Sequence, residues 1–113
     1  MSVPEGTQPE EAALRVTTDP STRTVVLEGE LDLASTDRFV QALRPLLDHR
    51  EPVTVDLAGL EFMDSSGLRA VIQSARKAGT LVLLNPRGQV GQLLKLCDLE
   101  RLDGIRIEGL EDE

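Results

Sequence analysis

The segment FMDSSGL, residues 62–68, contains the side chains of this sequence whose types and spacing best suit chemistry or recognition. It places one carboxylate, Asp64, directly before two hydroxyls, Ser65 and Ser66, and a glycine. If Asp64 is the N-cap of a helix, its carboxylate accepts hydrogen bonds from the amides of Ser66 or Gly67. Ser65 is then the first helical residue, and its hydroxyl has no obligatory partner. The motif is therefore either an ordinary helix start or a regulatory hydroxyl at the positive end of a helix.

Two neighbours of the serines complete the predicted helix start. Met63 precedes the cap and Leu68 is the fourth helical residue, which is the spacing of a hydrophobic staple. We expect Gly67 to leave the first turn without side-chain cover, so that another molecule could approach the backbone closely. On this expectation, the surface around the serines is open to a partner.

Catalysis by either serine is disfavoured by the residues around it. A nucleophile elbow needs a glycine two residues before and two residues after the serine, but Met63 and Asp64 occupy the preceding positions. The single histidine, His49, falls near the end of a predicted helix, where positive charge is favoured for structural reasons. One Cys and one His do not make a metal site, and the sequence has no glycine-rich phosphate loop. The sequence therefore predicts a protein that is not an enzyme and that uses no metal or cofactor.

A second polar stretch, GELD at residues 29–32, follows a predicted strand. Glu30 and Asp32 can be the polar end of that strand and nothing more. Alternatively, they project into a loop at the sheet edge, where binding residues collect. Because the loops of an α/β sheet gather at the carboxyl ends of its strands, we expect Asp32 and the helix after FMDSSGL to share one partner-facing surface.

Alternating strands and helices are predicted to hold these two segments. Residues 12–18 and 23–31 have the patterns of two strands, and the turn sequence DPST joins them as a hairpin. Further strands are predicted at 52–57, 80–84 and 104–109. From the second strand onward, strand and helix alternate. This order predicts an α/β domain with a small mixed, mostly parallel sheet of about five strands flanked by helices.

Three helices complete the pattern. The first begins at Ser35 or Thr36, either of which can cap it, and Pro45 is expected to kink it or end it early. The second follows FMDSSGL and stops near Gly79. The third follows the sequence NPRG. Its apolar face is expected to include Cys97, which is the only cysteine and cannot form an internal disulfide.

Composition limits the partners of the chain. Its 113 residues suit one domain, and aromatic residues make up only 2%, so we expect an aliphatic core and no aromatic platform for single-stranded nucleic acid. No apolar run is long enough to span a membrane, and the N-terminus lacks the features of a signal peptide. We therefore expect a cytoplasmic protein without a membrane partner.

The net charge of −8 is concentrated at the two ends of the sequence. Residues 1–11 and 108–113 hold seven acids and no base, which leaves 13 acidic and 12 basic residues in the body. A body so close to neutral argues against nucleic-acid binding. We expect one domain at 12–107, with acidic flexible tails at 1–11 and 108–113.

Taken together and in this order, GELD after an early strand, the strand VTVDL and FMDSSGL resemble the anti-sigma factor antagonists of the STAS domain family. The later segment GTLVLLNPRGQVGQLLKLCDLERL is also similar to that family, and the resemblance covers roughly residues 12–107. It implies a STAS-type fold whose first strand runs against the others. Such proteins commonly finish with a further helix, whereas only EGLEDE follows the last predicted strand here.

The resemblance also implies a function. Ser65, directly after the motif aspartate, matches the family's phosphorylation site. The unphosphorylated protein would bind an anti-sigma factor that is also a serine kinase, and so release the sigma factor. Phosphorylation would abolish this binding, and a serine phosphatase would restore it. The partner-binding residues implied by the matching stretches are Glu30, Asp32, Asp64, Ser66, Gly67 and Arg69.

Two other functions are compatible with the size of the chain. One is a STAS scaffold subunit of the stressosome type, although such assemblies usually have additional domains. The other is a two-component receiver, which takes phosphate on aspartate and needs an acidic cluster after its first strand and a lysine after its last. Here the first strand ends in TTDP, and Lys77 and Lys95 lie in predicted helices, so the receiver is disfavoured.

Overall fold

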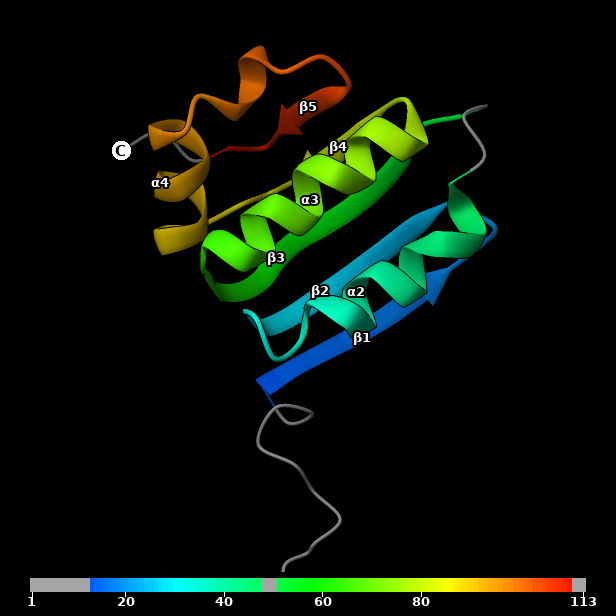
Figure 1. Cartoon of the computed structure of the whole chain (residues 1–113), viewed down its shortest axis with the longest axis horizontal. Coiled ribbons are helices and arrows are strands. Elements are labelled where there is room, and N and C mark those ends of the chain that lie inside the picture. The colour runs from blue at the N-terminus through cyan, green and yellow to red at the C-terminus, as the bar shows by residue number, and fades with distance from the viewer. Residues whose placement is uncertain (1–12, 48–50, 111–113) are drawn as a thin grey trace, which may run out of the picture.

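A five-stranded sheet, in the order β1-β2-β3-β4-β5, runs through the computed structural model, which describes residues 13–47 and 51–110 (Figure 1). The first two strands form an antiparallel hairpin, and each later strand pairs in parallel with the strand before it. The predicted mixed, mostly parallel sheet is thereby confirmed. The strands are β1 (Leu14–Asp19), β2 (Thr24–Leu31), β3 (Val53–Met63), β4 (Leu81–Leu84) and β5 (Ile105–Glu108).

Helices α2 (Thr36–Leu43) and α3 (Ser65–Ala78) lie side by side on one face of the sheet (Figure 1). The chain leaves α2 through the short 3-10 helix η1 (Arg44–Leu46), because Pro45 lacks the N–H that would continue the α-helix. The predicted early end of this helix is therefore confirmed. Helix α4 (Gly88–Leu96) lies at the end of the sheet where β3 gives way to α3 (Figure 1), and η2 (Leu99–Arg101) leads into β5.

The core lies between the sheet and the helices and is almost entirely aliphatic, as the low aromatic content predicts. Alternate residues of the strands point into it, and Phe39 of α2 is the only aromatic side chain among the described core residues. Burial of one such leucine or valine side chain is worth about 1.5–3 kcal/mol. Fully buried members include Leu14, Val25, Leu27, Leu31, Phe39, Leu43, Val55, Leu57, Met63, Val71, Leu81, Leu83 and Leu94.

Strand β3 is longer than predicted. The sequence pattern places it at 52–57, whereas it extends to Met63 and pairs with β2 as far as Leu31. Its pairing with β4 ends at Asp56, so residues 57–63 project beyond β4. Register shifts between β2 and β3 accommodate the extra length. The FMDSSGL segment therefore begins inside a strand end that pairs with a neighbouring strand, β2, on one side only.

Two other placements differ from the prediction. Cys97 is exposed, because α4 ends at Leu96 and the chain turns away through Asp98, which has a left-handed backbone (φ 57°). Glu108, which falls in both the predicted strand 104–109 and the predicted tail 108–113, is the last residue of β5, so the strand prediction holds for it and the tail prediction does not. Gly109 and Leu110 of the predicted C-terminal tail are also described, and Leu110 is half-buried. The predicted tail at 1–11, residues 111–113 and the position of His49 fall outside the described residues. Within the described residues, no helix is both long and apolar enough to cross a membrane.

Candidate functional site

The two polar stretches singled out from the sequence meet at the carboxyl ends of β2 and β3. Glu30 pairs with Phe62, and Leu31 pairs with Met63. One step further, the backbone N–H of Asp64 donates to the carbonyl of Leu31 at 3.2 Å. The parallel pairing therefore carries the start of α3 directly alongside the GELD turn, as expected for neighbouring strands of an α/β sheet.

Asp64 is the N-cap of α3. Its backbone is extended (φ −104°, ψ −172°), and its Oδ1 accepts a hydrogen bond from the Gly67 N–H at 3.0 Å. Ser65 is the first helical residue and is exposed, while Ser66 is half-buried. The predicted cap and the accessible position of Ser65 are confirmed. Because Asp64 supplies the cap, the Ser65 hydroxyl is not needed to satisfy the helix terminus.

The expectation for Gly67 is wrong. We expected it to leave the first turn open to a partner, but the residue is buried. A Cβ atom at this position would lie 2.7 Å from the Leu31 carbonyl oxygen and 2.9 Å from Met63 Cγ. Glycine is therefore required here because α3 begins in close contact with the ends of β2 and β3. In this structure Gly67 is therefore covered by the protein itself and is not exposed to a partner.

The Gln89 side chain of α4 forms hydrogen bonds with the backbone of Met63 at the end of β3. The Met63 N–H donates to Gln89 Oε1, and Gln89 Nε2 donates to the Met63 carbonyl, both at 2.9 Å. The side-chain amide thus satisfies both backbone groups of a β3 residue that lies beyond the end of β4. Sequence reasoning missed this residue, because a glutamine in a predicted helix carries no signal of the strand that it contacts.

Asp32 and Ser35 build the turn between β2 and α2. Asp32 Oδ1 accepts from the Ala34 N–H at 3.1 Å and lies 3.2 Å from Ser35 Oγ. Ser35 occupies the N-cap position, but its buried hydroxyl makes no cap hydrogen bond. It instead accepts from the Asp32 N–H at 3.0 Å and lies 3.1 Å from the Glu30 carbonyl. One carboxylate oxygen of Asp32 is therefore already used within the protein.

The side chain of Glu30 lies away from this turn. It lines a polar hollow with Arg15, Glu28 and Glu61. Arg15 and Glu28 are exposed and alternate with core-facing residues of β1 and β2, so the hollow is on the sheet face opposite α2 and α3. The structure therefore brings Asp32, Asp64 and Ser65 together, while the Glu30 side chain faces the other way.

Ser65 also begins a shallow groove along the outside of α3. The groove is lined by Ser65, Leu68, Arg69, Ile72, Gln73 and Arg76 and has a volume of about 410 Å³. Arg69 stands one helical turn after Ser65, which is the spacing at which side chains of a helix interact. Both side chains are exposed. In the described part of the chain, no group of three or more His, Cys, Asp or Glu side chains is placed to hold a metal ion.

Comparison with known proteins agrees with this geometry. The family described as "Mlab, STAS domain" matches residues 14–107, and the chain belongs to the STAS domain family. A comparison with curated protein sequences found no match.

Several solved structures have the same fold. An anti-sigma factor antagonist from Mycobacterium paratuberculosis is 20% identical over 88% of each chain, with a TM-score of 0.70. A putative anti-sigma factor antagonist from Thermotoga maritima is 19% identical over 84% of this chain and 85% of its own, with a TM-score of 0.65. The anti-sigma factor antagonist SpoIIAA, in its unphosphorylated form, is 22% identical over 89% of each chain, with a TM-score of 0.58.

Proposed function

We propose that this chain is an anti-sigma factor antagonist whose partner binding is switched by phosphorylation of Ser65. The unphosphorylated protein binds an anti-sigma factor that is also a serine kinase, and this binding releases the sigma factor. Phosphorylated protein does not bind, and a serine phosphatase returns it to the binding form. The protein acts by binding rather than by catalysis, and we expect it to work in the cytoplasm.

The observation that carries this proposal is the exposed hydroxyl of Ser65 at the first position of α3. Asp64 caps the helix, so the hydroxyl is available for modification without loss of the cap. The structural similarity to three anti-sigma factor antagonists supports the same conclusion at the level of the fold.

A phosphate on Ser65 should leave the fold intact. Negative charge at a helix N-terminus is favoured by about 0.3–1 kcal/mol, and α3 has no acidic residue in its first turn. The adjacent Asp64 carboxylate opposes part of this gain. Burying a phosphate of charge −1.5 to −2 beside Asp64 in an interface, without a matched basic pocket, costs several kcal/mol. Each 1.4 kcal/mol is a tenfold loss of affinity, so the complex is lost while the domain stays folded.

Kinase labelling with ATP, followed by peptide mapping, tests the proposal. Ser65→Ala should fold normally, bind the anti-sigma kinase and resist labelling. Ser66→Ala is the matched control, because it removes the neighbouring hydroxyl and should still accept phosphate. Ser65→Asp should fold and bind more weakly by calorimetry, although one carboxylate only partly imitates a phosphate.

Two results would contradict the proposal in different ways. Labelling that persists in Ser65→Ala and disappears in Ser66→Ala would move the site by one residue. Absence of labelling in the wild type with its cognate kinase would leave Ser65 as a helix-start residue without a regulatory role.

A further inference from the structure

Unpaired basic side chains are concentrated in the helical layer formed by α2, η1 and α3. Six of the described basic residues interact with another group of the protein, and they lie outside this layer. The other described basic residues have no hydrogen bond or ion pair within the described part of the chain, and all of them belong to α2, η1 or α3. They are Arg38, Arg44, Arg69, Arg76 and Lys77. One of them, Arg38, has a buried Nη1 atom without a hydrogen-bond partner.

Acidic residues are nearly absent from the same layer. Asp37 is the only acid within α2 and η1, and α3 contains none. The complete chain carries a net charge of −8. The positive charge of the helical layer is therefore a local property that opposes the overall charge. Such an arrangement selects a partner surface of the opposite sign and speeds its association.

The groove that starts at Ser65 gives this charge a definite shape. Its residues Ser65, Leu68, Arg69, Ile72, Gln73 and Arg76 recur at the three- and four-residue intervals of one helix face, and we call them the basic stripe. Leu68 and Ile72 are half-buried and form its apolar centre, and Arg69 and Arg76 are exposed on its flanks. From Ser65 to Arg76 the stripe is about 16 Å long, at a rise of about 1.5 Å per residue.

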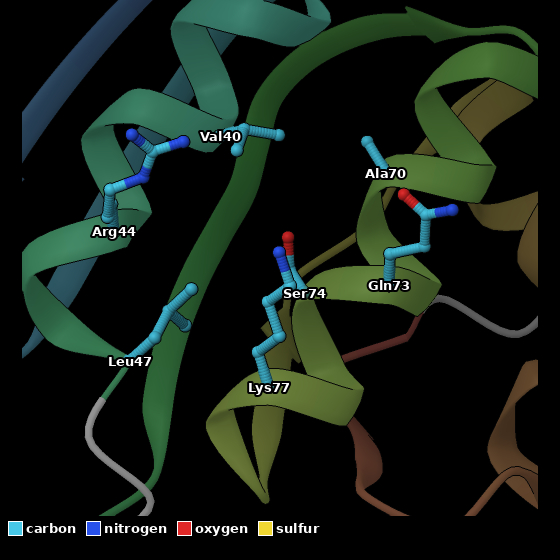
Figure 2. Close-up of a pocket in the computed structure, with 7 residues that line it drawn as sticks. All are labelled: Val40, Arg44, Leu47, Ala70, Gln73, Ser74 and Lys77. Atoms are coloured by element: carbon cyan, nitrogen blue, oxygen red, sulfur yellow. The ribbon is translucent and has the colours of Figure 1, made fainter.

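A second groove on the other side of α3 extends the basic surface. It lies between α3 and α2 with η1, and its volume is about 290 Å³. Figure 2 shows Val40 and Leu47 facing Ser74 and Lys77 across this groove, with Arg44 on the same side as Val40. Gln73 lines both grooves. Basic groups therefore border α3 on both sides along its outer face.

We propose that the basic stripe is the docking surface for an acidic amphipathic helix of the partner protein. An apolar centre with charged flanks is the surface that one amphipathic helix presents to another, and the flanking charges set the choice of partner. The partner helix places apolar side chains on Leu68 and Ile72 and carboxylates beside Arg69 and Arg76. A partner RNA is disfavoured, because the centre of the stripe is aliphatic and contains no aromatic side chain for base stacking.

This inference rests on the proposed function and gives the phosphate a specific effect. Ser65 belongs to the stripe, one helical turn before Arg69. A phosphate at this position adds negative charge to the surface that must attract carboxylates. It also pairs with Arg69 within the same helix, at the four-residue spacing that favours ion pairs. Phosphorylation therefore repels the acidic helix and removes one of its counter-charges at the same time.

Binding of the cognate anti-sigma kinase to charge variants, measured by calorimetry at two salt concentrations, tests the proposal. Arg69→Gln and Arg76→Gln should each weaken binding roughly 2- to 5-fold, as expected for the loss of one exposed ion pair, and the double variant roughly tenfold. Arg106→Gln is the matched control. It changes the net charge equally, but its guanidinium pairs with Glu108 on β5, so binding should be unchanged. Wild-type affinity should fall with added salt, and the double variant should lose much of this dependence.

The outcomes distinguish failure of the docking surface from failure of the proposed function. If the double variant binds like the wild type while Ser65→Asp still binds weakly, the switch stands and the basic stripe is not its docking surface. If Arg106→Gln weakens binding as much as the stripe variants, only net charge matters and the proposal is wrong. Wild-type protein that binds RNA but not the kinase would overturn both. In the complex, Arg76→Lys should couple by a zero-length carbodiimide reaction to a carboxylate of a partner helix, and coupling only to a non-helical segment would refute the proposed occupant.

Discussion

Replacing Gly67 with alanine adds one methyl group at the point where α3 begins in closest contact with the sheet. The new Cβ would lie 2.7 Å from the Leu31 carbonyl oxygen and 2.9 Å from Met63 Cγ. The first of these is a backbone atom, which cannot move without disturbing the pairing of β2 with β3. The start of α3 must therefore shift outward, and the Gly67 N–H moves away from the Asp64 carboxylate that it now reaches at 3.0 Å.

The expected loss of stability is the sum of one stabilising effect and two destabilising effects. Alanine in a helix is favoured over glycine by about 1 kcal/mol. Overpacking of a well-filled site costs about 1–3 kcal/mol, and a weakened N-cap costs about 1 kcal/mol more. The free energy of unfolding should therefore fall by about 1–3 kcal/mol. Without the steric contact, the same substitution would raise it.

Urea unfolding of Gly67→Ala, followed by circular dichroism, measures this change. Gly59→Ala is the matched control, because the three atoms nearest to its Cβ would all belong to the flexible side chain of Glu28, with Cγ closest at 2.9 Å. That variant should be neutral or more stable by a few tenths of a kcal/mol, since alanine restricts the unfolded chain. If Gly67→Ala is as stable as Gly59→Ala, the first turn of α3 does not pack tightly against Leu31. The turn would then be open to a partner, as the sequence alone suggested.

Three further predictions concern groups around the strand ends. Gln89→Ala should reduce the free energy of unfolding by about 1–2 kcal/mol, because two hydrogen bonds to the Met63 backbone are lost. Gln89→Glu should not restore this stability, since a carboxylate cannot donate to the Met63 carbonyl. Equal stability of the wild type and the two variants would refute the contact. Asp32→Asn keeps a side-chain oxygen that can accept the hydrogen bonds of the turn, so the midpoint of thermal unfolding should change little. Binding of the kinase should weaken. Unchanged binding would mean that Asp32 has only a structural role. The Ser21 hydroxyl, 2.7 Å from Asp19, holds the pKa of that carboxyl below its ordinary value. The ionised form therefore stabilises the fold above the unfolded pKa, and this contribution is lost as pH falls through the folded pKa. In an NMR titration Ser21→Ala should raise the pKa of Asp19, and an unchanged value would rule out this cause.

The features predicted well from the sequence are those set by neighbouring residues. Asp64 followed by two serines and a glycine is sufficient to place a helix start, because capping is a local interaction. Pro45 ends α2 for an equally local reason. The hairpin and the succession of strands and helices along the chain follow from side-chain alternation and turn residues. These local signals also located Ser65 correctly at the exposed first position of α3.

The features that the sequence did not predict depend on contacts between distant segments. Gly67 looked like an open backbone position, and only the packing of α3 against Leu31 shows why glycine is needed. Gln89 lies 26 positions after Met63, and nothing near either residue indicates their paired hydrogen bonds. Cys97 fits the apolar period of α4 but follows the last helical residue, so the exact end of the helix decides its exposure. For Gly67 and Gln89 the missing information is the position of another element, and for Cys97 it is the exact residue at which its own helix ends.

The start of α3 is held by several groups, and the Ser65 hydroxyl is not among them. The Asp64 carboxylate caps the helix, and the Gln89 amide fixes Met63 just before it. The close fit of Gly67 against Leu31 sets the distance of the helix from the sheet. Each of these contributes about 1 kcal/mol or more to the native state, whereas charge at the Ser65 position changes stability by about 1 kcal/mol at most. A modification of Ser65 can therefore alter the surface that a partner contacts without changing the helix that presents it. A switch built in this way needs no second conformation, because the electrostatic change at the surface is itself the signal.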